Sequence, residues 1–211
     1  MKRNLIAAAA LAFIAFNSAH AANITGLRNT GLGDSGQADV NYTLNSAASS
    51  TPIITYDSQW PIGPWLANDS TSKWITPTAS QGESFDPWTA GTYTYTLSFD
   101  LTGYNAASAG FSGRMAADNA VVVKLNNSVI GSGTGFTDWT SFSANSGFVP
   151  GVNKLDFVVT NWAQNGGNPT GLRVEFGSSS VMAAVPEPET YAMLLGGLVM
   201  VGAVARRRKQ Q

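Results

Sequence analysis

Six tryptophans stand out among the residues of this chain that could take part in binding. A flat indole stacks on the apolar face of a sugar ring, while amide and carboxyl groups beside it bond the sugar hydroxyls. Two tryptophans have such neighbours in the sequence. They give the candidate sugar-binding residues Trp65, Asn68, Asp69, Trp162 and Asn165. The alternative for each tryptophan is a place in the core or beneath a loop, so exposure of the rings decides between the two interpretations.

Catalytic chemistry is restricted by the residues that the sequence lacks. There is no cysteine, and the single histidine, His20, lies in a segment that we expect to be removed. The remaining chain therefore cannot build a histidine-dependent triad, a cysteine nucleophile, a disulfide or a usual zinc site. Glu83 and Glu175 are the two glutamates before the C-terminal segment, and no pair of carboxylates has the setting of a glycosidase. We predict a protein that is not an enzyme.

Oxygen ligands for a metal occur in the segment GLGDSGQADVN, where Asp34 and Asp39 are candidate calcium ligands. Their spacing differs from that of an EF-hand loop, and aspartate is also common in turns that bind no metal. Calcium binding and a structural turn are both open. We predict no other cofactor.

The charge of the chain limits its partners. Residues 22–185 contain six basic and eleven acidic side chains, which gives a net charge of −5. A domain of this sign repels nucleic acid and anionic membranes, so we predict no nucleic-acid partner. The polar residues are mostly Asn, Ser, Thr and Gly, whose neutral groups suit water and sugars.

The N-terminus has the three parts of a secretory signal peptide. Lys2 and Arg3 precede an apolar run over residues 5–16, and the small residues Ala19 and Ala21 occupy the positions that signal peptidase reads. We predict a signal peptide over residues 1–21, with signal peptidase as a partner and export of the remainder.

The C-terminus combines a proline-rich segment, an apolar run and a basic cluster. The proline-rich segment is Val185, Pro186, Glu187, Pro188 and Glu189. The apolar run over about 191–205 predicts a short transmembrane helix, about 22 Å long against about 30 Å of hydrocarbon. The basic tail 206–211, with Arg206, Arg207 and Arg208, predicts a stop to transfer across the membrane. A plain anchor and a processing signal both fit this pattern.

These three parts, in this order, resemble the PEP-CTERM sorting signal over residues 185–211. The resemblance implies processing by exosortase, a membrane protease-transferase of Gram-negative bacteria. It also implies an exported protein of the envelope, outer surface or medium that is transiently anchored in the inner membrane, with exopolysaccharide as a candidate partner. The same tail is also labelled an ice-binding protein C-terminal domain. Neither label implies an activity for the rest of the chain.

The segment between the two ends alternates apolar and polar residues with the period of a β-strand. The segment TYTYTLSFD places Tyr93, Tyr95, Leu97 and Phe99 on one face, and residues 121–125, 155–159 and 172–176 follow the same pattern. Asn126-Asn127 predicts a two-residue hairpin, because asparagine tolerates positive φ. We predict an all-β domain over 22–184, an antiparallel β-sandwich or jelly roll.

Residues 90–176 also resemble galactose-binding-like jelly rolls. The resemblance rests on Ala117-Asp118-Asn119, on the hairpin VKLNN and on the turn GVNKL, with Asn127 where glycine is usual. It implies that carbohydrate is a frequent ligand of such folds. Two functions are open: an exopolysaccharide-associated carbohydrate-binding module, and a structural surface or biofilm-matrix protein without a small ligand.

Overall fold

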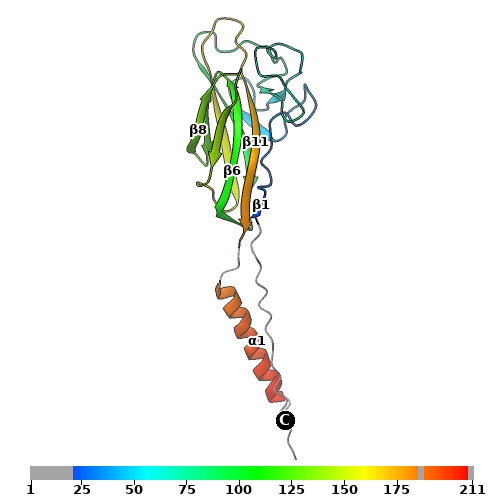
Figure 1. Cartoon of the computed structure of the whole chain (residues 1–211), viewed down its shortest axis with the longest axis vertical. Coiled ribbons are helices and arrows are strands. Elements are labelled where there is room, and N and C mark those ends of the chain that lie inside the picture. Colours follow the sequence, from blue (N-terminus) through cyan, green and yellow to red (C-terminus); the bar gives the residue numbers. More distant parts are fainter. Residues whose placement is uncertain (1–20, 185–187, 209–211) are drawn as a thin grey trace, which may run out of the picture. The chain divides into compact units, whose positions relative to one another are not determined.

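Two antiparallel sheets pack face to face in the computed structural model, which describes residues 21–184 and 188–208 (Figure 1). The strands are β1 (Ala21–Ala22), β2 (Tyr42–Asn45), β3 (Ile53–Ile54), β4 (Ile75–Thr76), β5 (Gly91–Asp100), β6 (Tyr104–Asp118), β7 (Ala120–Leu125), β8 (Ser128–Thr134), β9 (Thr140–Ala144), β10 (Val152–Asn161) and β11 (Gly171–Ala183). Sheet A has the order β3-β4-β11-β6-β9, with β1 also paired to β11, and sheet B has the order β2-β5-β10-β7-β8. From β5 to β11 the chain changes sheet at every connection except that between β7 and β8. This connectivity confirms the predicted antiparallel jelly-roll sandwich.

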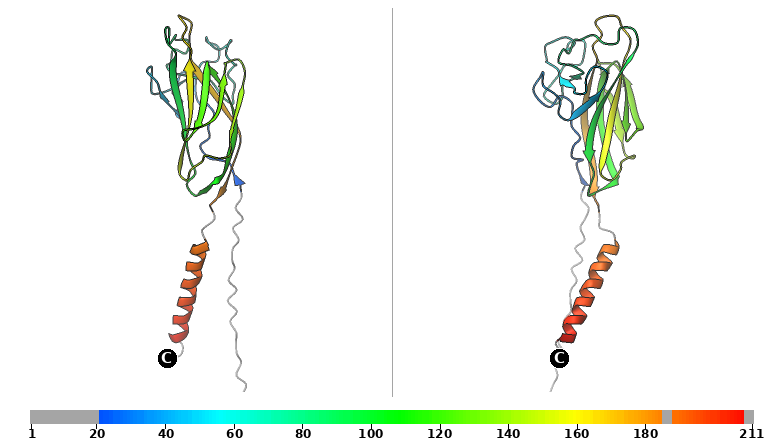
Figure 2. Two further views of the ribbon diagram at one scale, coloured as in Figure 1. Left: turned by 90° about the vertical axis from the view of Figure 1, so that its left-hand side faces the viewer. Right: turned by 180° about the vertical axis from the view of Figure 1, so that it is seen from behind.

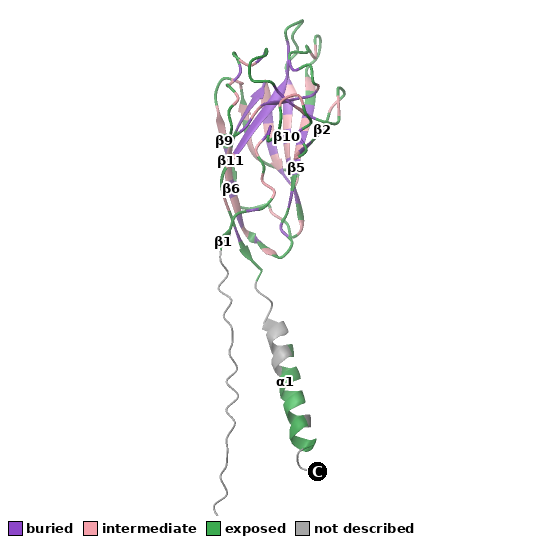
Figure 3. Ribbon diagram, turned by 90° about the vertical axis from the view of Figure 1, so that its right-hand side faces the viewer, coloured by how far each residue is buried: buried purple, intermediate pink, exposed green. Residues whose placement is uncertain are grey.

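The central strands of sheet B follow the predicted alternation. Tyr93, Tyr95, Leu97 and Phe99 of β5 are all buried in the core between the sheets, while the threonines between them point outward. The residues of β10 opposite them are buried as well, and Leu155 pairs with Leu97 on one side and Leu125 on the other. Figure 3 shows buried parts of the strands, including β5 and β10, and mostly exposed loops.

The hairpin between β7 and β8 confirms the turn prediction. Asn126 and Asn127 have φ angles of 48° and 70°. Two consecutive residues with positive φ are the requirement of a type I′ turn, whose twist matches that of the flanking strands.

Aromatic rings connect the two sheets across the core. Phe142 of β9 contacts Phe157 of β10 edge to face, with 5.5 Å between the ring centroids. Phe111 of β6 contacts Phe99 of β5 in the same way at 6.4 Å. Edge-to-face packing places the positive rim of one ring on the negative face of the next, which adds to the gain from burial. The core therefore needs no disulfide to join its layers.

One end of the sandwich, which we call the apex, carries the long connections. The segments between β3 and β5 and the loop between β10 and β11 lie there, at the opposite end from β1 (Figures 1 and 2). The amide N–H of Gln164 donates to the carbonyl of Asp86, and that of Phe85 donates to the carbonyl of Asn168. These bonds join loops that are far apart in the sequence.

Residues 55–74, which we call the covering loop, lie over the apical half of the outer face of sheet A. Trp65 and Trp74 pack there on Ala116 of β6. The buried guanidinium of Arg173 fixes the loop, because it donates to Ser72 Oγ at 2.7 Å and to the carbonyl of Ala67, and it pairs with Asp69. A buried cation with several partners holds a loop firmly, since breaking any contact leaves a charge unsatisfied.

Residues Ala21–Ala184 form one compact unit. The C-terminal segment contains helix α1 (Pro188–Arg208), with Arg206, Arg207 and Arg208 in its last turn. Among residues 21–184 and 188–208, no helix is long and apolar enough to cross a membrane, so the transmembrane segment predicted over 191–205 is not supported.

Several predicted features lie outside the described residues. These are most of the signal peptide, including Ala19, and the sorting residues Val185, Pro186 and Glu187. Ala21 is described and pairs with Met182 in sheet A.

Candidate functional site

A cleft of about 220 Å³ opens at the apex, and we call it the apex cleft. It lies where the covering loop, the connection between β6 and β7, and the loop between β10 and β11 meet. The side chains that matter for binding are Trp60, Trp65, Asp118, Asn119, Gln164 and Asn168. Phe136 from the connection between β8 and β9 also lines the cleft, so segments from four parts of the chain build one site.

The inner wall of the cleft is a buried indole bonded to a carboxylate. The Trp65 ring is 2 % exposed and packs on Trp74, with 4.3 Å between the ring centroids. Its Nε1–H donates to Asp118 Oδ2 at 2.9 Å. The Nε1–H of Trp74 donates to the carbonyl of Leu66 at 2.8 Å. Both indole N–H groups are thus satisfied, as buried polar groups must be.

Asp118 is a buried acid at the last position of β6. Its Oδ1 accepts a hydrogen bond from Asn119 Nδ2 at 2.5 Å. Burial raises the pKa of Asp118 to about 6, because removing a carboxylate from water disfavours its charged form, although the hydrogen bond from Trp65 partly offsets this. Near neutral pH the side chain can change between acceptor and donor within the cleft wall.

The backbone of Trp162 is fixed from two sides while its ring stays in solvent. Its N–H donates to Asn119 Oδ1 at 2.7 Å, and its carbonyl accepts from Asn168 Nδ2 at 2.9 Å. Asn168 is buried and also donates to the carbonyl of Phe85 at 2.8 Å. The Trp162 ring is 53 % exposed. A rigid backbone below a free indole lowers the entropy that is lost when a ligand is bound.

Trp60 forms the outer wall and is held in a similar way. Gln81 fixes the adjacent backbone, because its Nε2 donates to the carbonyl of Gln59 at 2.9 Å and its Oε1 accepts from Tyr56 N at 2.6 Å. A Cβ atom at Gly82 would lie 2.7 Å from Cδ1 of Trp60, so a glycine is needed to leave room for the ring. The Trp60 ring is 54 % exposed.

A third tryptophan of the apex loops, Trp88, is 78 % exposed. Large apolar side chains that gather on an exposed surface mark a place of interaction, whereas single ones need no explanation. Here three indoles lie on loops that hydrogen bonds connect. Trp60 lines a cleft with amide and carboxyl groups, and the backbone of Trp162 is bonded to two residues of its lining. This combination fits a polar ligand with apolar faces, such as a sugar.

The lining of the apex cleft offers less for catalysis than for binding. Asp118 is the one carboxylic acid among the residues that line it. Glycoside hydrolysis generally uses two carboxyl groups on opposite sides of the scissile bond. The groups present can hold and orient a sugar.

The structure separates the predicted sugar-binding residues. Trp162 is exposed as a platform must be, and Asn165 is exposed in the same loop. Trp65 is buried and can offer no free ring face, so its assignment as a stacking platform is wrong.

Asn68 and Asp69 act within the covering loop. Asn68 Oδ1 accepts from the N–H of Trp74 at 2.9 Å, and its Nδ2 donates to Thr55 Oγ1 at 2.9 Å. Asp69 Oδ1 accepts from the N–H of Thr71 at 2.7 Å, while its Oδ2 lies 2.9 Å from Arg173 Nη2. Their polar atoms are used to shape and fix the loop.

Sequence reasoning missed Trp60 and the wall residues Asp118 and Asn119 as parts of a site. The sequence around Trp60, SQWPIGPW, has no acidic or amide group next to the ring except Gln59. One signal was its position directly before Pro61, because a residue-proline pair is typical of turns, and Trp60 lies in the turn closed by the N–H of Ile62 and the carbonyl of Gln59.

The two calcium candidates differ in their surroundings. Asp39 is buried, and its carboxylate accepts from the N–H of Gly31 at 2.8 Å and from the N–H of Asn41 at 2.9 Å. Burial raises the pKa of Asp39, although these bonds partly offset it. Asp34 is exposed. Across the described ranges, no three His, Cys, Asp or Glu side chains gather closely enough to hold a metal ion.

Comparison with known families identifies the C-terminal segment. Residues 184–209 match the PEP-CTERM protein-sorting motif, as the order of its three parts predicted. This motif implies exosortase processing and an exported protein associated with the cell envelope. It covers the tail alone and gives no activity to the sandwich.

No curated protein matches the sequence. Among solved structures, a mutant of a carbohydrate-binding module of family 29 is 10 % identical, with 78 % of this chain and 92 % of that chain covered and a TM-score of 0.37. An FMN-binding β-glucuronidase from Facaelibacterium prausnitzii is 15 % identical, with 74 % and 23 % covered and a TM-score of 0.37. A β-glucosidase from Kluyveromyces marxianus is 12 % identical, with 81 % and 21 % covered and a TM-score of 0.37. Similarity at this level carries no argument about ligand or activity.

Proposed function

We propose that this protein is an exported, non-catalytic carbohydrate-binding protein of the cell envelope, and that the apex cleft binds the sugar. The observation that carries this proposal is the half-exposed indole of Trp60 in the lining of a cleft with amide and carboxyl groups. The half-exposed Trp162 adds to it, because its backbone is bonded to the lining residues Asn119 and Asn168. Exopolysaccharide is the proposed ligand class, because proteins with this sorting motif are expected at the cell surface.

The chemistry of the cleft matches a neutral sugar. An indole covers the C–H face of a pyranose, and the amides of Asn119 and Gln164 can both donate to and accept from hydroxyl groups. A cleft of this size takes one or two sugar units and stays wet at its rim. We expect a dissociation constant between about 1 mM and 1 μM, or about −4 to −8 kcal/mol.

The direct experiment is a glycan array with the purified sandwich, residues 21–184, followed by affinity electrophoresis in gels containing polysaccharide from the producing cells. Retention of the wild type and loss of retention in Trp162→Ala would support the proposal. Near-ultraviolet circular dichroism of the variant must match that of the wild type. If the wild type is not retained by any glycan, the structural surface or matrix protein is the better account.

Export and processing form a separate part of the proposal. We infer that signal peptidase removes residues 1–21 and that exosortase processes the tail at the Val185–Glu189 segment. Mass spectrometry of the protein from its producing cells should find an N-terminus at Ala22 and a missing or modified tail. An intact chain through Gln211 in cells that contain exosortase would contradict the processing step. Alanines at Pro186, Glu187 and Pro188 should leave the tail uncleaved.

A further inference from the structure

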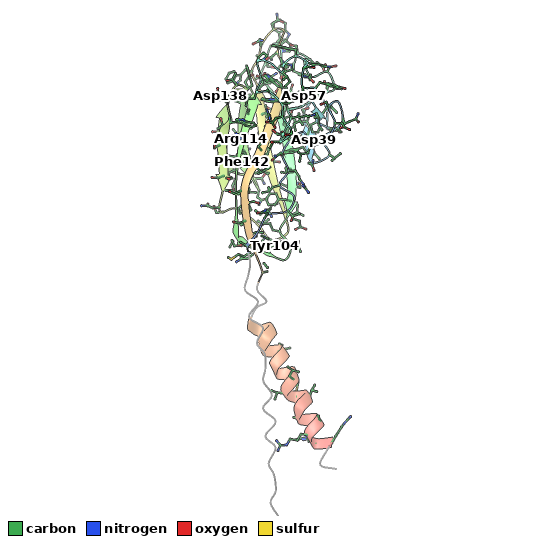
Figure 4. The ribbon with its side chains drawn as sticks, turned by 45° about the vertical axis from the view of Figure 1, so that its right-hand side comes forward. Asp39, Asp57, Tyr104, Arg114, Asp138 and Phe142 are labelled. Carbon is green, nitrogen blue, oxygen red and sulfur yellow. The ribbon has the colours of Figure 1, made fainter. Side chains whose placement is uncertain are left out.

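The outer face of sheet A has an uncovered half beside the half that the covering loop protects. Two adjoining hollows of about 650 and 380 Å³ lie there across β6, β9 and β11, and both are lined by Ser112 and Ser143. Figure 4 labels Arg114 and Phe142, which mark this part of the sheet. We call the two hollows together the serine groove. From position 110 to 114 of β6 it extends about 13 Å along the strand.

The groove exists because its outward side chains are small. They are Ser112, Ser141, Ser143, Gly177, Ser178 and Ser180. Serine and glycine are poor strand formers, whereas β-branched residues cover a pleated surface well. These residues therefore lower the β-strand propensity of three neighbouring strands, β6, β9 and β11.

The outer face of sheet B shows that this composition is not general to the fold. Outward positions of its strands β5, β7 and β10 carry mostly larger side chains, some of which pair across strands, as Thr96 Oγ1 does with Asp156 Oδ1 at 2.6 Å. Others on this face are Thr92, Thr94, Lys124, Lys154 and Val158. Both sheets pack on the same core, so the fold itself does not require small outward residues. The small residues of sheet A are therefore a local feature.

A fixed cation closes the apical end of the groove. Arg114 Nε donates to Glu175 Oε2 at 2.7 Å, and its guanidinium carbon lies 4.4 Å from the centroid of the Trp139 ring. Glu175 is buried and also lies near Arg173. Because Arg114 is neutralised by Glu175, the end of the groove offers orientation by hydrogen bonds without a free positive charge.

We propose that the serine groove binds an extended, neutral polysaccharide chain. Within residues 21–184, the exposed hydroxyls of Ser141 and Ser143 have no intramolecular hydrogen-bond partner, and a hydroxyl both donates to and accepts from the hydroxyls of a sugar. An acidic polymer is disfavoured because the domain carries a net charge of −5. The open, elongated shape suits the side of a chain, while the apex cleft suits a single unit or a chain end. The ligand class rests on the proposed function, and the location of the site does not.

The test compares two serine-to-tyrosine variants on the outer faces of the two sheets. Ser143→Tyr fills the groove on β9, and Ser98→Tyr adds the same bulk at an exposed position of β5. Tyrosine is favourable in strands, so both variants should fold. Titration calorimetry uses neutral polysaccharide purified from the producing cells, first as intact polymer and then as its hydrolysed monosaccharides.

We expect the wild type and Ser98→Tyr to bind the polymer at least tenfold more tightly than the monosaccharides. Ser143→Tyr should lose that advantage and keep its affinity for monosaccharides. Polymer binding by Ser143→Tyr that equals the wild type would overturn the groove. Ser143→Tyr could weaken polymer binding while Trp60→Ala changes the affinity for neither polymer nor monosaccharides. That result would support binding at the serine groove and contradict binding at the apex cleft. If the wild type does not bind the polymer, the result contradicts binding at both sites. Ser180→Tyr on the neighbouring strand repeats the test should Ser143→Tyr not fold.

Discussion

Trp60 and Trp65 are five residues apart in one loop, and the structure uses them in opposite ways. Trp65 is 2 % exposed, stacks on Trp74 and donates to Asp118. Trp60 is 54 % exposed and has no comparable partner in the core. The difference comes from what lies beneath each ring, because the small Ala116 of β6 leaves room for the buried pair. Buried indoles should therefore carry stability, and exposed indoles should carry binding.

The largest expected effect is the loss of Trp74. Its ring is fully buried, and its N–H is bonded to the carbonyl of Leu66. Trp74→Ala should lower the free energy of unfolding by about 3–5 kcal/mol, since it leaves a cavity beneath the covering loop. Urea denaturation of residues 21–184 measures this. A loss below about 1 kcal/mol would mean that the covering loop does not depend on the buried pair.

The carboxyl group that meets the buried pair should make stability depend on pH. Burial raises the pKa of Asp118 to about 6, whereas an unfolded aspartic acid has a pKa of about 3.9. Between these values the folded state holds a proton that the unfolded state has lost, so this group's contribution falls as the pH rises. Asp118→Asn cannot titrate at this position and keeps an acceptor for Trp65.

The wild type should therefore lose about 2 kcal/mol relative to Asp118→Asn between pH 4 and pH 7. Chemical denaturation of both proteins across this range gives the difference directly, and the other titrating groups cancel in it. A difference that does not change with pH would show that Asp118 is less buried in solution.

The smallest expected effect is that of Trp88, which is 78 % exposed and does not line the apex cleft. Trp88→Ala should change the free energy of unfolding by less than about 0.5 kcal/mol, as exposed surface substitutions usually do. It should also leave sugar affinity unchanged. Weaker binding in Trp88→Ala would extend the site beyond the cleft toward the β5 side of the apex.

The strands were predictable because their signal is local. The alternation in TYTYTLSFD sets which residues of β5 face the core, and the two asparagines at 126 and 127 specify the turn that follows β7. The sorting motif was predictable for the same reason, since its parts are contiguous in the tail.

The site was only partly predictable, because burial of each tryptophan depends on distant residues. Trp65 and Trp162 both have asparagine neighbours in sequence, so local composition predicted both as sugar-binding residues. Trp65 is buried through Asp118, 53 residues away. Trp162 stays exposed because Asn119 and Asn168 hold only its backbone. No pattern within a loop encodes such long-range contacts.

The central claim is that the exposed indole in the lining of the apex cleft binds sugar without supporting the fold, and Trp60→Ala tests it most directly. Titration calorimetry with polysaccharide from the producing cells should compare the wild type, Trp60→Ala and the matched control Trp88→Ala. The account predicts at least a tenfold loss of affinity in Trp60→Ala, or about 1.4 kcal/mol. It also predicts unchanged affinity in Trp88→Ala and unfolding free energies within about 0.5 kcal/mol of the wild type for both variants. Unchanged affinity in Trp60→Ala with the fold intact would contradict the claim.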